Sequence, residues 1–283
     1  MATARELRRR IRSVKNIAKI TRAQQLVAAA RMRRAQQRVT EARPYAEALA
    51  DVLAGLANQA GRARHPLLMQ RPPERILVVE VTPDRGLCGA LISNIHRRVA
   101  RELVDRTGQK SMLAVGRKAR DFARRTHTPL LAEFTGLPDS PSLADITPAA
   151  RLVIDAYSDQ QTDLVLLGYT RFISTLTQHA VLEQLLPVVP PQGAAGAVSN
   201  FLYEPDEGEV LADLLPRYIE MRLFQALLES KASEQSARMV AMRNATDNAN
   251  ELAADYTLTL NKERQAGITR EIAEIAAGAA ALS

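Results

Sequence analysis

The C-terminal stretch, residues 217–283, reads RYIEMRLFQALLESKASEQSARMVAMRNATDNANELAADYTLTLNKERQAGITREIAEIAAGAAALS and decides the fold. It contains no proline, and its only glycines are Gly267 and Gly278, so nothing forces the backbone to leave the helical conformation. At 1.5 Å per residue, such a helix measures roughly 100 Å. We therefore predict one long shaft helix over residues 206–283.

This helix carries a coiled-coil pattern. A heptad-like frame runs through Leu228, Ala232, Gln235, Met239, Met242, Thr246, Ala249, Ala253, Tyr256 and Leu260. A second frame, out of phase with the first, holds Ile268, Ile272, Ile275, Ala279 and Leu282. A phase slip of this kind locally re-winds a supercoil. The pattern predicts that the helix packs against another helix.

The end of the chain has no charged side chain after Glu274. A free terminus normally faces water and is polar, and this apolar run is shorter than the roughly 20 residues that span a bilayer. Two interpretations stay open. The terminus sits in a protein socket, where small uncharged side chains allow it to turn, or it packs on the core of its own chain.

In the N-terminal segment, residues 1–58, we predict a second shaft helix, from Ala2 to about Ala57. Its frame holds Leu7, Ile11, Val14, Ala18, Thr21, Gln25, Ala28, Met32, Ala35, Val39 and Ala42, with Ile17, Ile20 and Val27 as an apolar flank. Pro44 predicts a kink. The natural partner is the C-terminal helix, so we expect a long antiparallel coiled coil made from the two ends of the chain.

Between these helices we expect a linker over 59–74, an α/β domain over 75–191 and a Gly/Ala-rich loop over 192–205. Within the domain, strands are predicted at 75–81, 111–115 and 163–168, helices at 90–105, 117–126 and 148–158, a short apolar segment at 130–134 and an antiparallel strand or extended arm at 169–181. Strands that alternate with helices indicate a mostly parallel, Rossmann-like sheet. The fold class is therefore α/β plus a long antiparallel coiled coil, with the domain inserted in the shaft.

Basic charge is concentrated at the N-terminus. Residues 1–43 hold 13 Lys and Arg against Glu6 and Glu41, a net charge of +11, whereas the whole chain has +7. Such a helix suits nucleic acid, an anionic membrane surface or an acidic protein. No aromatic residue precedes Tyr45, which weakens the nucleic-acid interpretation. A single cysteine excludes an internal disulfide, and we expect a soluble, cytoplasmic protein without a signal peptide.

The turn at residues 82–89 follows a predicted strand and opens a helix. Its glycines, Gly86 and Gly89, match neither a dinucleotide fingerprint nor a phosphate loop, so we expect a tight turn that lets the helix pack on the sheet. Cys88 is more simply a small buried residue than a nucleophile. The four histidines lack metal-ligand spacing. We expect no cofactor, no metal and no catalytic site.

Four stretches, at residues 5–23, 84–89, 233–249 and 261–272, resemble the gamma subunit of F-type ATP synthases, and the similarity covers the whole chain in one order. The resemblance implies a central-stalk rotor that transmits torque between a membrane c ring and a catalytic ring of three alpha and three beta subunits, coupling proton translocation to ATP synthesis. It also implies an epsilon subunit as partner and a peripheral location on the cytoplasmic face of a bacterial plasma membrane. The chain itself would not be catalytic.

From the residues alone, Arg238, Arg264 and Gln265 are long polar side chains on a helix of small residues, available to a surrounding partner. Carried over position by position, the resemblance implies contact with the alpha/beta ring for Lys19, Arg22, Gln24, Arg85, Cys88, Arg238, Arg264, Gln265, Thr269, Ile275 and Leu282. This sequence departs from the family pattern at Gln24, Leu260 and Glu263, where methionine, tyrosine and alanine are usual.

Two functions of other classes remain as alternatives. A nucleic-acid-binding protein would use the basic N-terminal helix, and its binding would depend steeply on salt. A nucleotide-dependent enzyme would use the α/β domain, and the isolated chain would then bind nucleotide.

Overall fold

The computed structural model describes residues 3–59, 65–189 and 206–281. The predicted loop at 192–205, residues 60–64 of the predicted linker and Leu282 lie outside the described residues. In chain order the elements are α1 (Ala4–Gln59), a 3-10 turn (Pro66–Leu68), β1 (Arg75–Val81), α2 (Leu91–Asp105), β2 (Gln109–Val115), α3 (Arg117–Arg125), β3 (Leu130–Phe134), α4 (Leu143–Ser158), β4 (Leu164–Phe172), β5 (Gln178–Leu186) and α5 (Glu207–Ala281).

Five strands form one sheet in the order β3-β2-β1-β4-β5. β1 pairs in parallel with β2 and β4, β2 pairs in parallel with β3, and β4 pairs antiparallel with β5. The predicted mostly parallel sheet is therefore confirmed. Parallel strands joined through helices need both faces covered, which explains why β1 is apolar at nearly every position.

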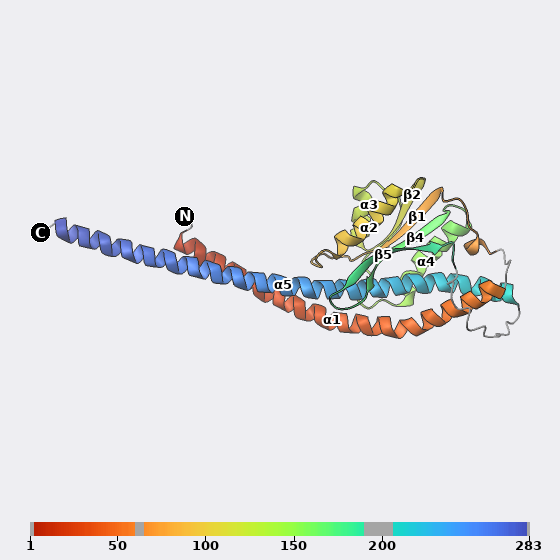
Figure 1. Ribbon diagram of the computed structural model, residues 1–283, viewed down its shortest axis with the longest axis horizontal. Coiled ribbons are helices and arrows are strands. Elements are labelled where there is room, and N and C mark those ends of the chain that lie inside the picture. Colours follow the sequence, from red (N-terminus) through yellow and green to blue (C-terminus); the bar gives the residue numbers. More distant parts are fainter. Residues whose placement is uncertain (1–2, 60–64, 190–205, 282–283) are drawn as a thin grey trace. The chain divides into compact units, whose positions relative to one another are not determined.

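The two faces of the sheet are covered by different helices (Figure 1). Ile76 and Val78 of β1 pack in one cluster with Ile95 of α2 and Phe122 of α3. The alternate residues of β1 belong to a second cluster, which contains Leu77, Val79, Ile146, Val153, Leu215 and Ile219, from β1, α4 and α5. The period of two along a strand thus divides one apolar run between two cores.

The chain forms two compact units, one made of Met1–Ala28 and Met239–Ser283 and the other of Ala29–Arg238. Both long helices contribute to both units. In the first unit the helices run antiparallel, because Thr21 Oγ1 lies 2.7 Å from Thr246 Oγ1 while Arg10 lies beside Tyr256. In the second unit, α1 and α5 meet through Ala35, Val39, Leu228 and Ala232, which share one core cluster.

The predicted coiled-coil frames agree with burial. Every frame residue of α1 from Leu7 to Ala42, and every one of the first frame of α5 from Leu228 to Leu260, is buried or half-buried. The second frame differs, since Ile268, Ile272 and Ile275 are all exposed. The helix continues through this second frame, but no other part of the described chain covers it.

Several boundaries differ from the predictions. α4 begins at Leu143 rather than Pro148, because Ser142 and Asp145 form a capping box in which Asp145 Oδ2 accepts the Ser142 N–H at 2.7 Å. Pro148 lies inside that helix, as Pro44 lies inside α1 and Pro216 inside α5. The region 169–181, predicted as an antiparallel strand or an extended arm, forms an antiparallel hairpin, in which β4 continues to Phe172 and β5 starts at Gln178.

Candidate partner-binding surfaces

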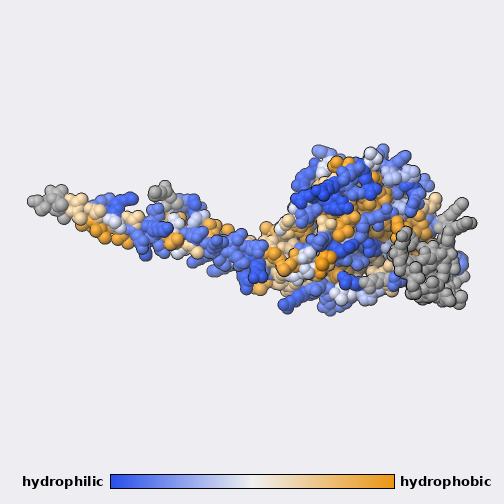
Figure 2. All heavy atoms as spheres, viewed as in Figure 1, coloured by the Kyte–Doolittle hydropathy of each residue, from blue (hydrophilic) through white to orange (hydrophobic). Residues whose placement is uncertain are grey.

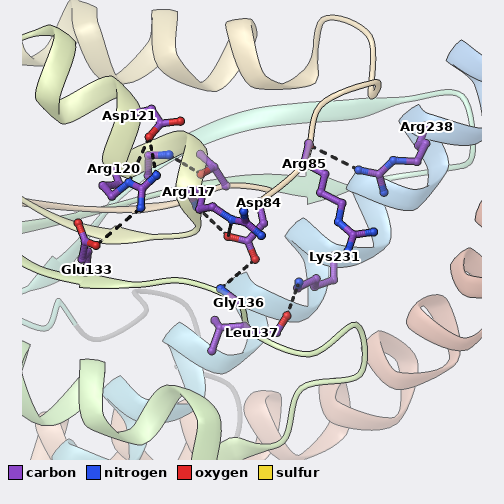
Figure 3. Close-up of polar contacts among 12 residues, drawn as sticks. Asp84, Arg85, Arg117, Arg120, Asp121, Glu133, Gly136, Leu137, Lys231 and Arg238 are labelled. Atoms are coloured by element: carbon purple, nitrogen blue, oxygen red, sulfur yellow. Dashed lines mark hydrogen bonds and ion pairs between the residues drawn. The ribbon is translucent and has the colours of Figure 1, made fainter.

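The turn after β1, residues 82–89, is tied to the ends of the neighbouring strands (Figure 3). Asp84 Oδ1 accepts the backbone N–H of Arg117 at 2.8 Å, and Asp84 Oδ2 accepts that of Gly136 at 3.0 Å. Thr82 Oγ1 accepts the N–H of Ala119 at 2.7 Å. These bonds fix the turn to the start of α3 and to the segment after β3. A surface built here rests on a rigid base.

The turn exposes some side chains and buries others. Gly89 and Leu87 have φ of 58° and 63°, a left-handed conformation that glycine adopts freely and leucine rarely does. Leu87 is 63% exposed, Arg85 is exposed, and Cys88 is buried. Burial raises the pKa of the Cys88 thiol, which disfavours the thiolate. The buried interpretation of Cys88 is confirmed, so its thiol is not presented to a partner.

Arg238 of α5 lies against this turn rather than standing out from the helix (Figure 3). Its Nη2 donates to Glu234 Oε1 at 2.8 Å and to the carbonyl oxygen of Gly86 at 3.3 Å. The Arg238 side chain is only 14% exposed, and that of Glu234 is 8% exposed. Glu234 was not predicted as a site residue, although the i, i+4 spacing of a glutamate and an arginine is a known signal for such a pair.

Basic side chains line a shallow groove in the other unit, between α1 and α5. The groove is bordered by Lys15, Ala18, Lys19, Arg22, Thr246, Asp247 and Asn250. Lys19, Arg22 and Gln24 are exposed, and Arg22 Nη1 donates to Gln25 Oε1 at 3.0 Å. Lys19 and Arg22 therefore share one accessible surface, whereas Gln24, about 200° around the helix from Arg22, faces another side. The positive charge of the groove suits an acidic partner.

The distal part of α5 presents the remaining predicted residues. Arg264, Gln265 and Thr269 are exposed, and Thr269 Oγ1 donates to the Gln265 carbonyl of its own helix at 3.0 Å. Ile275 is 72% exposed. Figure 2 shows apolar side chains along this part of the helix. As far as Ala277, the side chains of this segment are exposed and do not pack on the core of their own chain. The side chains of residues 278–283, Leu282 included, lie outside the described residues, so the socket interpretation of the chain end stays a prediction.

The described residues show no metal-binding arrangement. Across 3–59, 65–189 and 206–281, no group of three or more His, Cys, Asp or Glu side chains is placed to hold a metal ion. His96 is a core residue, because its Nδ1 lies 2.8 Å from Glu80 Oε1 and its ring stacks on Phe122 at 4.4 Å. In the same residues, no helix is long and apolar enough to cross a membrane.

Comparison with known proteins identifies the family. The ATP synthase family model matches residues 3–282. An ATP synthase gamma chain of Dehalococcoides mccartyi is 49% identical over the full length of both chains, and one from a Roseiflexus species is 50% identical over all of this chain and 99% of its own. The chain belongs to the ATP synthase gamma-chain family. Membership gives it a central-stalk role in an ATP synthase, as the four resembling stretches implied.

Solved structures agree with this assignment. The chain resembles one from the central stalk and c ring of the Tetrahymena thermophila mitochondrial ATP synthase, with a TM-score of 0.63 and 25% identity, over 80% of this chain and 99% of the other. A chain of the Euglena gracilis mitochondrial ATP synthase has a TM-score of 0.69 over 99% of this chain and 94% of its own, and at 19% identity it supports the fold. The predicted fold class is confirmed.

Proposed function

We propose that this chain is the rotor of a bacterial ATP synthase, which carries torque between the membrane c ring and the catalytic ring and thereby couples proton translocation to ATP synthesis. The observation that carries the proposal is α5, a helix of 75 residues whose distal part exposes an apolar stripe. An exposed stripe of isoleucines on a globular protein marks an interaction site. In a rotor, this stripe would contact the surrounding ring of subunits, which forms the sleeve in which the shaft turns.

The partners follow from the same assignment. The similar solved structures come from assemblies described as central stalk with c ring, and as F1 with OSCP and c ring. We propose three alpha subunits, three beta subunits, an epsilon subunit and a c ring as the partners of this chain. It makes and breaks no covalent bond itself. Its contribution is to bias the conformations of catalytic sites on other subunits, a coupling of distant sites through rigid elements.

The exposed residues divide between two kinds of contact. Lys19, Arg22 and Arg85 are exposed basic side chains, suited to acidic loops of the catalytic subunits, and Gln24 is an exposed polar side chain of α1. The segment from Arg264 to Ile275 suits the sleeve, and Leu282 continues it in the sequence. Cys88 and Arg238 would act from beneath the surface, by shaping the turn that presents Arg85 and Leu87.

We place the chain on the cytoplasmic face of a bacterial plasma membrane, attached through its complex. The similar gamma chains of Dehalococcoides and Roseiflexus come from bacteria, which supports this location.

Co-purification tests the proposed function. The chain is expressed with the alpha and beta subunits of its own organism, and the isolated complex is analysed for stoichiometry and ATPase activity. We expect one copy of this chain per three alpha and three beta subunits, and altered activity when it is omitted. Failure to enter the ring, or entry in several copies, would contradict the rotor assignment.

A further inference from the structure

One segment of α5 is buried although most of its residues are polar. Each member is at most 9% exposed: Glu229, Ser230, Lys231, Ala232, Ser233, Glu234, Gln235 and Ser236. A helix buried all round is normally apolar, and buried polar groups need hydrogen-bond partners. The hydrogen-bond partners of this segment lie in several parts of the α/β domain.

Two serines bond to the backbone of β4 at a single residue. Ser230 Oγ accepts the N–H of Thr170 at 3.3 Å, and Ser233 Oγ donates to the carbonyl oxygen of Thr170 at 3.0 Å. The pairing of β1 with β4 ends at Gly168, so Thr170 lies beyond the last residue that β1 can satisfy. The two hydroxyls, about one helical turn apart, replace the missing strand and attach the helix to the sheet.

A third serine reaches the turn of the β4–β5 hairpin. Ser236 Oγ donates to the carbonyl oxygen of Thr175 and accepts from Gln178 Nε2 at 3.4 Å. Ser230, Ser233 and Ser236 recur every three residues, so they form a row along one side of the helix. This row is therefore hydrogen-bonded both to strand β4 and to the turn of the hairpin.

Other contacts hold the same segment from different directions (Figure 3). Lys231 Nζ donates to the carbonyl oxygen of Leu137, in the segment between β3 and α4, at 3.3 Å. Arg238 donates to the carbonyl oxygen of Gly86 in the turn after β1. Ala232 belongs to the apolar cluster that includes Ala35 and Val39 of α1. The helix is therefore bonded to strand β4 and to three loops of the domain, and it is packed on α1.

We propose that residues 230–238 of α5 are the torque clamp of the rotor, the site where the α/β domain and the shaft helix are locked against rotation about the helix axis. Apolar contacts are non-directional, whereas hydrogen bonds require defined distances and angles. A twist of α5 within the domain would break several hydrogen bonds together, of which the two to Thr170 are buried and the others part-buried. The three serines are positioning residues in this clamp, and the proposal rests on the proposed rotor function.

Torsional stiffness of the assembled complex tests the clamp. The complex of this chain with its alpha and beta subunits is immobilised through the ring, and a bead is attached to the α/β domain at Val104→Cys, an exposed position on α2. Angular fluctuation of the bead is recorded while a non-hydrolysable ATP analogue holds the ring. The test variant is Ser230→Ala/Ser233→Ala/Ser236→Ala. The matched control is Thr259→Ala, because Thr259 is exposed on the same helix and donates only to Asp255 of that helix among the described contacts.

We expect the angular variance to rise about twofold in the triple variant, since most of the hydrogen bonds from the helix to the hairpin are lost, and to stay unchanged in Thr259→Ala. In the whole synthase, reconstituted in vesicles, we expect ATP-driven proton pumping to fall relative to ATP hydrolysis. A triple variant that assembles with unchanged variance and unchanged pumping per ATP overturns the clamp. Failure of the unsubstituted chain to enter the ring would instead overturn the rotor function.

If the triple variant does not assemble, the single variants Ser230→Ala, Ser233→Ala and Ser236→Ala are measured in the same way. Intermediate increases in variance, with unfolding temperatures close to that of the unsubstituted chain, support the clamp. Three single variants with unchanged variance overturn it.

Discussion

Segments 229–238 and 264–275 belong to one uninterrupted helix but differ in their surroundings. The first is surrounded by its own domain, and its polar side chains bond to several backbone carbonyls. The second exposes nearly all its side chains, apolar ones included. A rotor needs both properties, since torque must enter the shaft without slip and the tip must turn without being held. The difference in burial assigns these two tasks to different segments of the helix.

Among the substitutions that test this comparison, Arg238→Ala is expected to have the largest effect on stability. The change leaves the carboxylate of Glu234 buried without its partner, so we expect the free energy of unfolding of the isolated chain to fall by about 3 kcal/mol. Chemical denaturation followed by circular dichroism measures it. Arg264→Ala, at an exposed arginine of the distal segment, is the control, with an expected change within about 0.5 kcal/mol. Equal losses in both variants would remove the distinction between the segments.

A smaller loss of stability is expected when side-chain volume is added to the buried segment. Ala232 is fully buried between α5 and α1, so Ala232→Leu overpacks the contact and lowers the unfolding free energy by about 2 kcal/mol. Ala266→Leu makes the same substitution at an exposed position of the same helix, where leucine is nearly as good a helix former as alanine. Thermal unfolding of the two variants gives the comparison. An unchanged unfolding temperature in Ala232→Leu would show that the segment is loosely packed.

Glu229 makes the buried segment sensitive to pH. Burial raises the pKa of its carboxyl, against the opposing effects of Arg171, Gln225, the Phe172 backbone and Arg43. The folded state therefore binds this proton more tightly than the unfolded state, and stability decreases as the pH rises through the folded-state pKa. We expect Glu229→Gln to stabilise the chain at neutral pH, and the gain to shrink toward pH of about 4, below the ordinary glutamate pKa.

The control for that prediction is Glu271→Gln, because Glu271 is exposed on the distal segment. Its unfolding free energy should follow that of the unsubstituted chain at every pH. A Glu229→Gln variant whose stability difference does not change between neutral and acidic pH would contradict the assigned role of burial.

The smallest effect on stability is expected at the distal segment itself. Ile272→Ser/Ile275→Ser removes two exposed apolar side chains, so unfolding of the isolated chain should change by no more than about 0.5 kcal/mol. In the synthase, however, the same variant should lower the yield of ATP per proton, because the sleeve contact is weakened. A strong loss of stability in the isolated chain would show that this stripe packs on the chain's own core.

Local patterns in the sequence predicted the elements well, for physical reasons. Burial of the frame from Leu7 to Ala42 followed from helical periodicity, and β1 was predicted with its observed bounds because its apolar run is flanked by polar residues. The predicted start of α4 at residue 148 was wrong, because the helix begins at Leu143, after a capping box of Ser142 and Asp145. An antiparallel strand was one of the alternatives at 169–181, but the turn at 173–177 was not predicted, because these residues include no glycine or proline to mark it.

The contacts of the candidate surfaces were less predictable. Arg238 was expected to project toward a partner, yet it bonds to Gly86, which is far away in the sequence and comes close only when the sheet has formed. Likewise, nothing local indicates that Ser233 satisfies the backbone at Thr170. Arg264 and Gln265 were identified as long polar side chains on a helix of small residues, and Lys19 and Arg22 through the resemblance to the gamma subunit; all four are exposed. Their contacts with the ring remain predictions.

Rotation is the measurement that tests the central claim most directly. The ring of alpha and beta subunits is fixed to a surface, a bead is attached to Val104→Cys on the α/β domain, and ATP is added. Because Cys88 is buried, a thiol reagent should label the introduced cysteine selectively. The account predicts continuous rotation of the bead in one direction, with threefold pauses set by the ring. A bead that stays fixed while the complex hydrolyses ATP would contradict it.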